Sequence, residues 1–232
     1  MTYLQKMMEK AEHILFLTGA GVSTTSGIPD YRSKTGLYTQ TTTDPEYLLS
    51  QSCLRQEPAV FYDFVTKHMY YPTAKPNIIH EKMAAATHHY DAHVITQNVD
   101  GLHQAAGTKD VLEFHGDLYH VYCQKCNEQV DYREYLKNMV HQHCGGILRP
   151  DVVLYGETIK QQVLDTAITL LAQADLIVVC GTSLRVYPFA GLVQYRKSTA
   201  QIVAINREKI TLPFGGKMIL EDAAKVFTKL DF

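Results

Sequence analysis

The chain has 232 residues, enough for one large domain with a smaller insert, and 46% of them are hydrophobic, so it can bury a sizeable core. Its formal net charge of −2 excludes a strongly basic protein, and nothing in the bulk charge indicates binding to nucleic acid or to a membrane surface. No stretch is typical of a signal peptide, and no apolar run reaches the about 18 residues of a membrane-spanning helix, so we expect a soluble cytoplasmic protein.

Five short apolar runs predict the buried strands of a parallel sheet. They are rich in β-branched residues and nearly continuous, as expected for strands that helices cover on both faces. In chain order they span residues 14–18, 92–96, 175–180, 201–205 and 217–220. Helix-like stretches lie between and after them, at 76–90, 158–174 and 221–230. This alternation predicts an α/β fold with a doubly wound parallel sheet, whose ligands bind at the carboxyl ends of the strands.

Two segments interrupt the alternation. Residues 34–75 are polar and rich in tyrosine, with a helical pattern over 57–71, and residues 119–148 contain clustered cysteine and histidine. We expect them to form a small second unit, with 34–75 as a helical module and 119–148 as a metal module. The segments 1–33, 76–118 and 149–232 would then form the large nucleotide-binding domain.

The stretch GAGVSTTSGIPDYRS, residues 19–33, directly follows the first predicted strand. Gly19 and Gly21 allow the backbone to approach a pyrophosphate, whose charge suits the N-terminus of a following helix. A Gly-x-Gly pair alone is equally typical of a plain strand-to-helix turn. The appended Pro-Asp-Tyr-Arg sequence favours a binding loop, because a plain turn has no need of an arginine and an aromatic ring.

Further polar turns lie at or near the ends of other predicted strands. In TQNVDGLHQAAG (96–107), Gln97, Asn98 and Asp100 offer amide and carboxylate groups to a neutral polar ligand. In EFHGD (113–117), a glycine leaves His115 accessible, and histidine suits general-base work near neutral pH. CGTSLRVYPFAG (180–191) and AINRE (204–208) complete the set. We expect ordinary helix or surface roles for His13, His68, His80, His88, His89, His93 and His120.

Three of the five cysteines cluster within one short segment. CQKC (123–126) and HQHC (141–144) form two ligand pairs, and two residues separate the members of each pair, a spacing that suits tetrahedral zinc. We expect Cys123, Cys126, His141 and Cys144 as ligands, with His143 as the alternative fourth ligand. Asn127 and Gly145 follow the two pairs and tolerate the left-handed backbone that such turns need. A set of four protein ligands leaves no open position, which indicates a structural site; coincidental cysteines in a polar loop are the alternative.

Together these motifs resemble the sirtuins, the family of NAD-dependent protein-lysine deacylases. The resemblance includes LRPDVVLYGE (148–157), keeps the family's motif order and covers essentially the whole chain. It implies a large Rossmann-like domain, a small domain of zinc and helical modules, and a cleft between them. It also implies removal of acyl groups from protein lysines, with nicotinamide and O-acyl-ADP-ribose as products.

The same resemblance implies roles for individual residues. It implies that His115 is the general base that takes a proton from a ribose hydroxyl, with Asn98 beside it in the catalytic site. It places Gly19, Ala20, Gly21 and Arg32 at the pyrophosphate and ribose, with Tyr31 shielding the reactive ribose carbon. It places Ser23, Ile28, Asn98 and Asp100 at nicotinamide, Gln97 at its ribose, and Gly181, Thr182, Ser183, Asn206 and Arg207 at adenosine. Substrate peptides would add a strand against Val152, Val153, Leu154, Tyr155, Gly156 and Glu157 and against residues 183–188.

The chain departs from the family pattern at two positions. His141 stands where the family usually has a third cysteine, and Tyr31 stands where phenylalanine is commoner. Members that prefer acidic acyl groups carry a tyrosine followed three residues later by arginine, whereas here Tyr38 is followed by Thr41. We therefore predict acetyl or another uncharged acyl group, because a succinyl carboxylate would lack its bidentate partner.

Two other functions are compatible with these residues. Mono-ADP-ribosyl transfer to protein would use the same cleavage of NAD with a different acceptor. A nucleotide-sensing scaffold with a zinc module would bind NAD without releasing nicotinamide.

Overall fold

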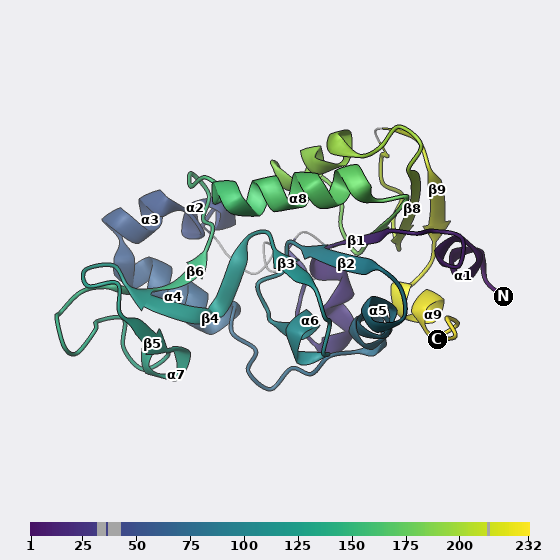
Figure 1. Ribbon diagram of the computed structural model, residues 1–232. Helices are drawn as coiled ribbons and strands as arrows, with labels where there is room; N and C mark the ends of the chain where they lie inside the picture. The colour runs from purple at the N-terminus through teal and green to yellow at the C-terminus, as the bar shows by residue number, and fades with distance from the viewer. Residues whose placement is uncertain (32–35, 37–42, 213) are drawn as a thin grey trace.

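A six-stranded parallel sheet is the centre of the computed structural model, which describes residues 1–31, 36, 43–212 and 214–232 (Figure 1). Its strands are β1 (Ile14–Thr18), β2 (Ala92–Thr96), β3 (Val111–Glu113), β7 (Leu176–Cys180), β8 (Gln201–Asn206) and β9 (Lys217–Leu220). Their order is β3-β2-β1-β7-β8-β9, and each neighbouring pair is parallel. The doubly wound sheet predicted from the apolar runs is therefore confirmed. The chain order reverses at β1, and this switch point is where such sheets bind ligands.

Helices cover both faces of this sheet, which explains why its strands are almost continuously apolar. On one face, Phe16 packs with α1 (Tyr3–Met8), α5 (Ile78–His89) and α9 (Ala223–Phe227). On the other face, Leu15 and Leu17 pack with α8 (Gln161–Gln173) and the 3-10 helix η4 (Phe189–Tyr195). Figure 1 shows α8 and α5 on opposite sides of the strands. Among the described residues, no helix is both long and apolar enough to span a membrane.

A second, smaller sheet lies to the left in Figure 1, with antiparallel order β5-β4-β6. Its strands are β4 (Gly116–Cys123), β5 (Gln129–Asp131) and β6 (Leu148–Val152), and the nearby helices are α2 (Pro45–Leu48), α3 (Gln51–Gln56), α4 (Pro58–His68) and α7 (Tyr132–Tyr135). Phe61 and Phe64 of α4 share one buried cluster with Leu118 and Val121 of β4. The two interrupting segments therefore pack on each other, although the 43 residues from 76 to 118 separate them in sequence.

The structure adds elements that the apolar runs did not predict. β3 has only three half-buried residues at the edge of the sheet, too short for a periodic signal. β4 and β6 extend past the limits expected for the metal module, because their outer residues continue the antiparallel pairing from Gly116 with Val152 to Cys123 with Leu148.

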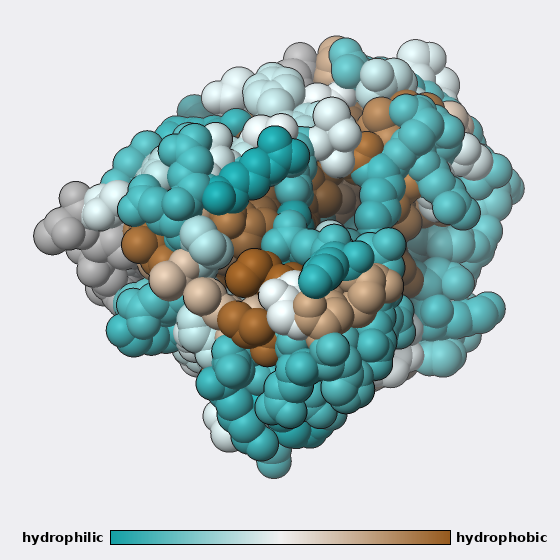
Figure 2. Space-filling model, turned by 90° about the vertical axis from the view of Figure 1, so that its left-hand side faces the viewer, coloured by the Kyte–Doolittle hydropathy of each residue, from teal (hydrophilic) through white to brown (hydrophobic). Residues whose placement is uncertain are grey.

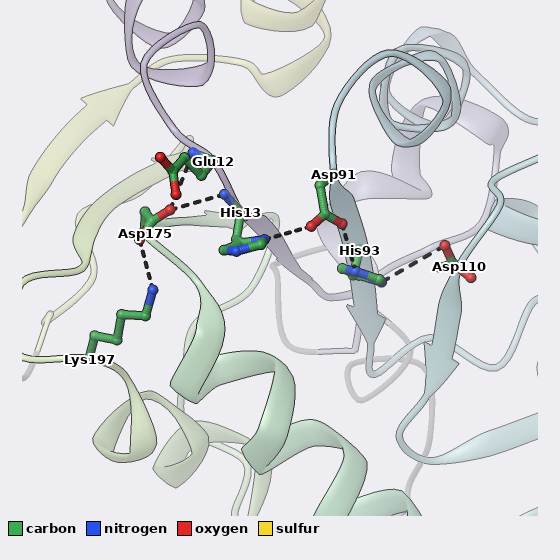
Figure 3. A network of polar contacts seen from close by, with 7 residues as sticks. All are labelled: Glu12, His13, Asp91, His93, Asp110, Asp175 and Lys197. Atoms are coloured by element: carbon green, nitrogen blue, oxygen red, sulfur yellow. Dashed lines mark hydrogen bonds and ion pairs between the residues drawn. The ribbon is translucent and has the colours of Figure 1, made fainter.

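The amino-terminal edge of the parallel sheet carries a network of ion pairs (Figure 3). His13, Asp91, Asp110 and Asp175 each directly precede a strand. His13 Nδ1 lies 2.6 Å from Asp91 Oδ2, and His93 Nε2 lies 3.2 Å from Asp91 Oδ1. Asp175 Oδ2 accepts from the His13 amide, while its Oδ1 lies 2.9 Å from Lys197 Nζ. These contacts join strand starts on the edge away from the expected ligand site and support structural roles for His13 and His93.

Candidate active site

A cavity of about 1100 Å³ lies at the carboxyl ends of the central strands. It is lined by residues that follow β1, β2, β7 and β8, and on its other side by the segment after β6. Figure 2 shows a hollow with hydrophobic atoms inside a largely hydrophilic surface. Of the predicted site residues, the lining includes Ala20, Gly21, Ile28, Tyr31, Gln97, Asn98, His115, Gly181, Thr182, Ser183, Asn206, Arg207 and Val152 through Glu157. Ser23 and Asp100 line a small adjoining pocket, and Arg32 lies outside the described residues.

Two glycine turns meet at the switch point. The Gly21 amide donates to the Gly181 carbonyl at 2.8 Å, which joins the ends of β1 and β7. A Cβ on Gly21 would lie 2.7 Å from Gly181 Cα, and one on Gly181 would lie 2.5 Å from the Val22 nitrogen. Any larger residue would push the two turns apart. Gly19 does not line the cavity, but its carbonyl accepts from Asn98 Nδ2 at 3.2 Å.

The helix expected after the first glycine turn is absent from the described residues, and that expectation is wrong. The chain instead forms two 3-10 turns, η1 (Ala20–Val22) and η2 (Thr24–Ser26), and ends them at Gly27 with φ 85°. Serine and threonine are weak helix formers, Gly27 adopts the left-handed conformation that ends helices, and Pro29 follows. The dipole of a long helix therefore cannot hold a phosphate here.

Asn98, Ser23 and Asp100 form one hydrogen-bonded chain beside the cavity. Asn98 Nδ2 donates to Ser23 Oγ at 3.1 Å, and Ser23 Oγ donates to Asp100 Oδ2 at 2.6 Å. The Leu102 amide donates to the other carboxylate oxygen at 3.0 Å. Burial raises the pKa of Asp100, and the bonds from Ser23 and Leu102 only partly oppose this. The residues form a polar wall whose carboxylate can accept a hydrogen bond from an amide.

His115 lies at the cavity wall in a defined tautomer. Its Nδ1 is 3.2 Å from the Gln97 carbonyl oxygen. A carbonyl only accepts, so Nδ1 carries the hydrogen and Nε2 of the neutral ring keeps its lone pair. Burial lowers the pKa of His115, and the bond to Gln97 opposes this only in part. The imidazole is thus neutral near pH 7 and able to take a proton at Nε2.

Polar residues beneath the first glycine turn, half-buried Asn77 and fully buried His80 and His103, were not predicted from the sequence to support the site. Asn77 caps α5 and donates from Nδ2 to the Val22 carbonyl at 2.9 Å and to Ser26 Oγ at 2.8 Å. His103 Nε2 lies 3.0 Å from Thr18 Oγ1, and its ring contacts that of His80 at 4.9 Å between centroids. Burial lowers the pKa of His80 to about 4 and that of His103 to about 3, so both rings stay neutral. An asparagine before a helical pattern indicates a helix cap. The bonds from Asn77 to Val22 and Ser26 could not be predicted, because they depend on the tertiary fold.

The segment after β6 is held by a largely buried ion pair. Arg149 Nη1 lies 2.6 Å from Glu157 Oε1, and its Nη2 donates to the Val152 carbonyl at 2.6 Å. Burial alone would raise the pKa of Glu157, but hydrogen bonds from Arg149 and the Leu154 amide outweigh it and lower that pKa. The Val153 amide donates to the His115 carbonyl at 2.9 Å. Glu157, predicted among the peptide-binding residues, thus has its carboxylate occupied in shaping this segment.

Arg207, predicted at adenosine, also has a protein partner. Its Nη2 lies 2.6 Å from Asp222 Oδ2, and both residues line the cavity. Burial opposes ionisation of Asp222, but hydrogen bonds from Arg207 and the Ala224 amide lower its pKa overall. The pair fixes the guanidinium at the wall next to Asn206.

The four predicted metal ligands converge. Their ligand atoms all lie within 4.8 Å of one another. Cys123 Sγ is 3.4 Å from Cys144 Sγ, and His141 Nδ1 is 3.5 Å from Cys126 Sγ and 3.3 Å from Cys144 Sγ. A tetrahedral zinc site with Zn–S bonds near 2.3 Å has ligand atoms about 3.8 Å apart. The side chain of His143 is 76% exposed and its Nδ1 faces Glu128, so the geometry favours His141 as fourth ligand.

The backbone around this cluster fits zinc. Asn127 and Gly145 have φ 59° and 68°, which confirms the left-handed turns expected after each pair. The Asn127 amide donates to the Cys123 carbonyl, and the Gly145 amide to the His141 carbonyl, each at 2.8 Å. A Cβ on Gly146 would lie 2.5 Å from Cys123 Sγ. Three thiols and one imidazole at this spacing form a donor set that suits zinc.

Comparison with known proteins agrees with the geometry. The Sir2 family model matches residues 19–188. An NAD-dependent protein deacetylase of Listeria monocytogenes serotype 4b is 55% identical over 99% of this chain and all of its own length. One of Lactiplantibacillus plantarum is 53% identical over 97% of this chain and 96% of its own.

Solved Sir2 structures share the fold over nearly the whole chain. One reported for the mechanism and regulation of Sir2 enzymes has a TM-score of 0.88 at 33% identity, covering 97% of this chain and 94% of its own. A Sir2 complex with deacetylated p53 peptide and 3′-O-acetyl-ADP-ribose has a TM-score of 0.87 at 30% identity, with the same coverage. The chain belongs to the Sir2 family.

Proposed function

We propose that this chain removes acetyl groups from protein lysines with consumption of NAD and yields nicotinamide and O-acetyl-ADP-ribose. The observation that carries the proposal is His115, a half-buried neutral imidazole whose Nε2 makes no hydrogen bond with any described residue, at the wall of a cavity large enough for a dinucleotide. The relatives named NAD-dependent protein deacetylases support it, as does the Sir2 complex that holds a deacetylated peptide and an acetylated ADP-ribose.

The chain's own residues would hold NAD along the strand ends. Ala20 and Gly21 would hold the pyrophosphate, helped by Arg32, and Gly181, Thr182, Ser183, Asn206 and Arg207 would surround adenosine. Asp100, oriented by Ser23, would accept from the nicotinamide carboxamide, and Tyr31 would cover the ribose. Bound NAD supplies an electrophilic ribose carbon that is exposed when nicotinamide leaves.

His115 would supply the proton transfer. Gln97 links two parts of the site, since its carbonyl accepts from His115 Nδ1 and its Nε2 donates to Thr182 Oγ1 at 2.7 Å. This fixes the ring so that Nε2 can take a proton from a ribose hydroxyl that is then free to attack the acyl carbon. His115 and Tyr31 are both half-buried, which would limit the access of water to this position.

We propose that residues 1–33, 76–118 and 149–232 form the cofactor-binding domain, while 34–75 and 119–148 form the small domain with one structural zinc. The separate core shared by α4 and β4 supports this division. The acyl-lysine peptide would lie between the segment 152–157 and the segment 183–188, which both line the cavity.

We also propose a cytoplasmic location. None of the five cysteines, all of which lie in the described part of the chain, forms a disulfide, and Cys53 and Cys180 are fully buried. Free thiols without a disulfide framework are typical of proteins in reducing compartments.

Incubation with NAD labelled in its ADP-ribose part and an acetylated peptide tests the proposed reaction. We expect the label to appear in O-acetyl-ADP-ribose, with one nicotinamide released for each acetyl group removed, because the acyl group is transferred to the ribose. Label that accumulates on protein would instead support mono-ADP-ribosyl transfer. NAD binding without nicotinamide release would support a nucleotide-sensing scaffold.

We expect deacetylation to be faster than desuccinylation on the same peptide. Tyr38 and Thr41, on which this prediction depends, lie outside the described residues. A hydrogen bond to a charged group contributes about 1.5 kcal/mol or more, so loss of the bidentate arginine partner corresponds to about tenfold in kcat/KM. A panel of acyl-lysine peptides measures this, and markedly faster desuccinylation would contradict it.

A further inference from the structure

The segment Leu184–Tyr187 forms an open rim of the cavity. Its exposure alternates, with Leu184 and Val186 half-buried and Arg185 and Tyr187 exposed. The amides of Arg185, Val186 and Tyr187 donate no hydrogen bond to any other described residue. Such amides can pair with the main chain of an incoming peptide.

Hydrogen bonds connect both walls of this part of the cavity to His115 or to Gln97, which holds its ring. On one wall, Val153 bonds to the His115 carbonyl. On the other, the Leu184 amide donates to Thr182 Oγ1 at 3.2 Å, and that hydroxyl accepts from Gln97, which holds the imidazole. A peptide that lies between these two walls with its acyl-lysine at His115 would run along the segment that carries Arg185.

Arg185 differs from the other charged groups near this end of the cavity. Glu157 is paired with Arg149, and Lys160 with Asp151 at 2.7 Å. Within the described part of the chain, Arg185 has no ion-pair or hydrogen-bond partner, although it lines the cavity. Glu208 and Lys209 lie beyond β8, on the proposed adenosine side.

We propose that Arg185 selects acetyl-lysine substrates that carry aspartate or glutamate within two residues of the modified lysine. This inference rests on the proposed deacetylase function. The guanidinium presents a rigid set of donors that matches a carboxylate, and it sits where the flanking side chains of a bound peptide leave the cavity. One exposed ion pair corresponds to about a two- to fivefold preference in kcat/KM.

The test compares acetylated peptides that differ only in one flanking residue, which is acidic, neutral or basic at each of the two positions on either side. For the unmodified chain we expect the acidic-to-neutral ratio of kcat/KM to reach about two to five at one or more positions and to fall as salt increases. Arg185→Gln should remove the preference, and Arg185→Glu should reverse it toward basic peptides. Lys229→Glu changes another exposed cation, one that does not line the cavity; it is the matched control and should keep the original ratio.

An acidic-to-neutral ratio of kcat/KM equal to one at every position overturns the proposal, and so does a preference for acidic peptides that persists in Arg185→Glu. In both cases deacetylation itself remains. Absence of deacetylation for all peptides, including the neutral one, would instead overturn the proposed function and this inference with it. Because each readout is a ratio within one variant, a general loss of activity in a variant does not mimic the expected result.

Discussion

Replacing His115 with alanine is expected to lower kcat/KM for deacetylation by about 10²- to 10⁴-fold, the contribution typical of a positioned general base. NAD should still bind, because the cavity wall that would hold it is built from the glycine turns and the Asn98–Ser23–Asp100 chain, which do not bond to the imidazole. Nicotinamide release reports turnover, and equilibrium binding reports the affinity for NAD. Measured on the same preparation, they separate a loss of catalysis from a loss of cofactor binding.

The pH profile of the unmodified chain gives an independent readout of the same group. Burial lowers the pKa of His115 from its usual value of 6.5, and a base works only in its deprotonated form. Activity should therefore be constant across neutral pH and be lost as pH falls through a value below 6.5. In His115→Ala this acidic limb of the kcat/KM profile should disappear from the residual activity.

His120→Ala is the matched control. His120 lies five residues further along the chain with its side chain 69% exposed, and it does not line the cavity. It should keep both the rate and the acidic limb. A comparable loss in His120→Ala, or full turnover in His115→Ala, would remove His115 from the proposed mechanism.

The sequence predicts well those features that depend on short segments. The runs at 14–18 and 92–96 became strands with those limits, since a fully buried parallel strand needs apolar residues throughout. The left-handed positions at Asn127 and Gly145 were equally local, because few residue types accept that conformation.

Features set by distant contacts could not be predicted in this way. Gly181 must be glycine because Val22 packs on it, and the two are 159 positions apart in the chain. The neutral pair His80 and His103 is recognisable only once α5 and α6 (Leu102–Ala105) are side by side. Glu157 is a further example. Its motif suggests contact with a peptide, and only the fold shows that Arg149 pairs with its carboxylate.

Replacing His141 with alanine is expected to weaken zinc binding by more than about 100-fold. Loss of a residue that only hydrogen-bonds to a metal ligand can already cost that much, and His141 is itself a ligand. The reason is that His141 Nδ1 completes a set of four ligand atoms, whereas three thiols alone leave one position of a tetrahedral ion open. Competition with a chromogenic chelator measures the affinity, and metal analysis after dialysis measures the stoichiometry, which we expect to be one zinc per unmodified chain.

His143→Ala and His141→Cys are the informative controls. His143 is two residues away and exposed, so its loss should leave zinc affinity within the same order of magnitude. His141→Cys supplies a fourth thiolate and should retain zinc. Equal weakening by His141→Ala and His143→Ala would contradict the proposed ligand set.

Loss of zinc should also lower the melting temperature, because the ligands belong to the core of the small unit. Cys123 is fully buried in the same cluster as Phe61 of α4 and Leu148 of β6. Free energy of metal binding is folding free energy where the ligands cannot meet without the fold. Chelation should therefore loosen the β4–β6 pairing and, through the Val153–His115 bond, the cavity wall. We expect deacetylation and the melting temperature to fall together. Restoring zinc to the unmodified chain should recover both.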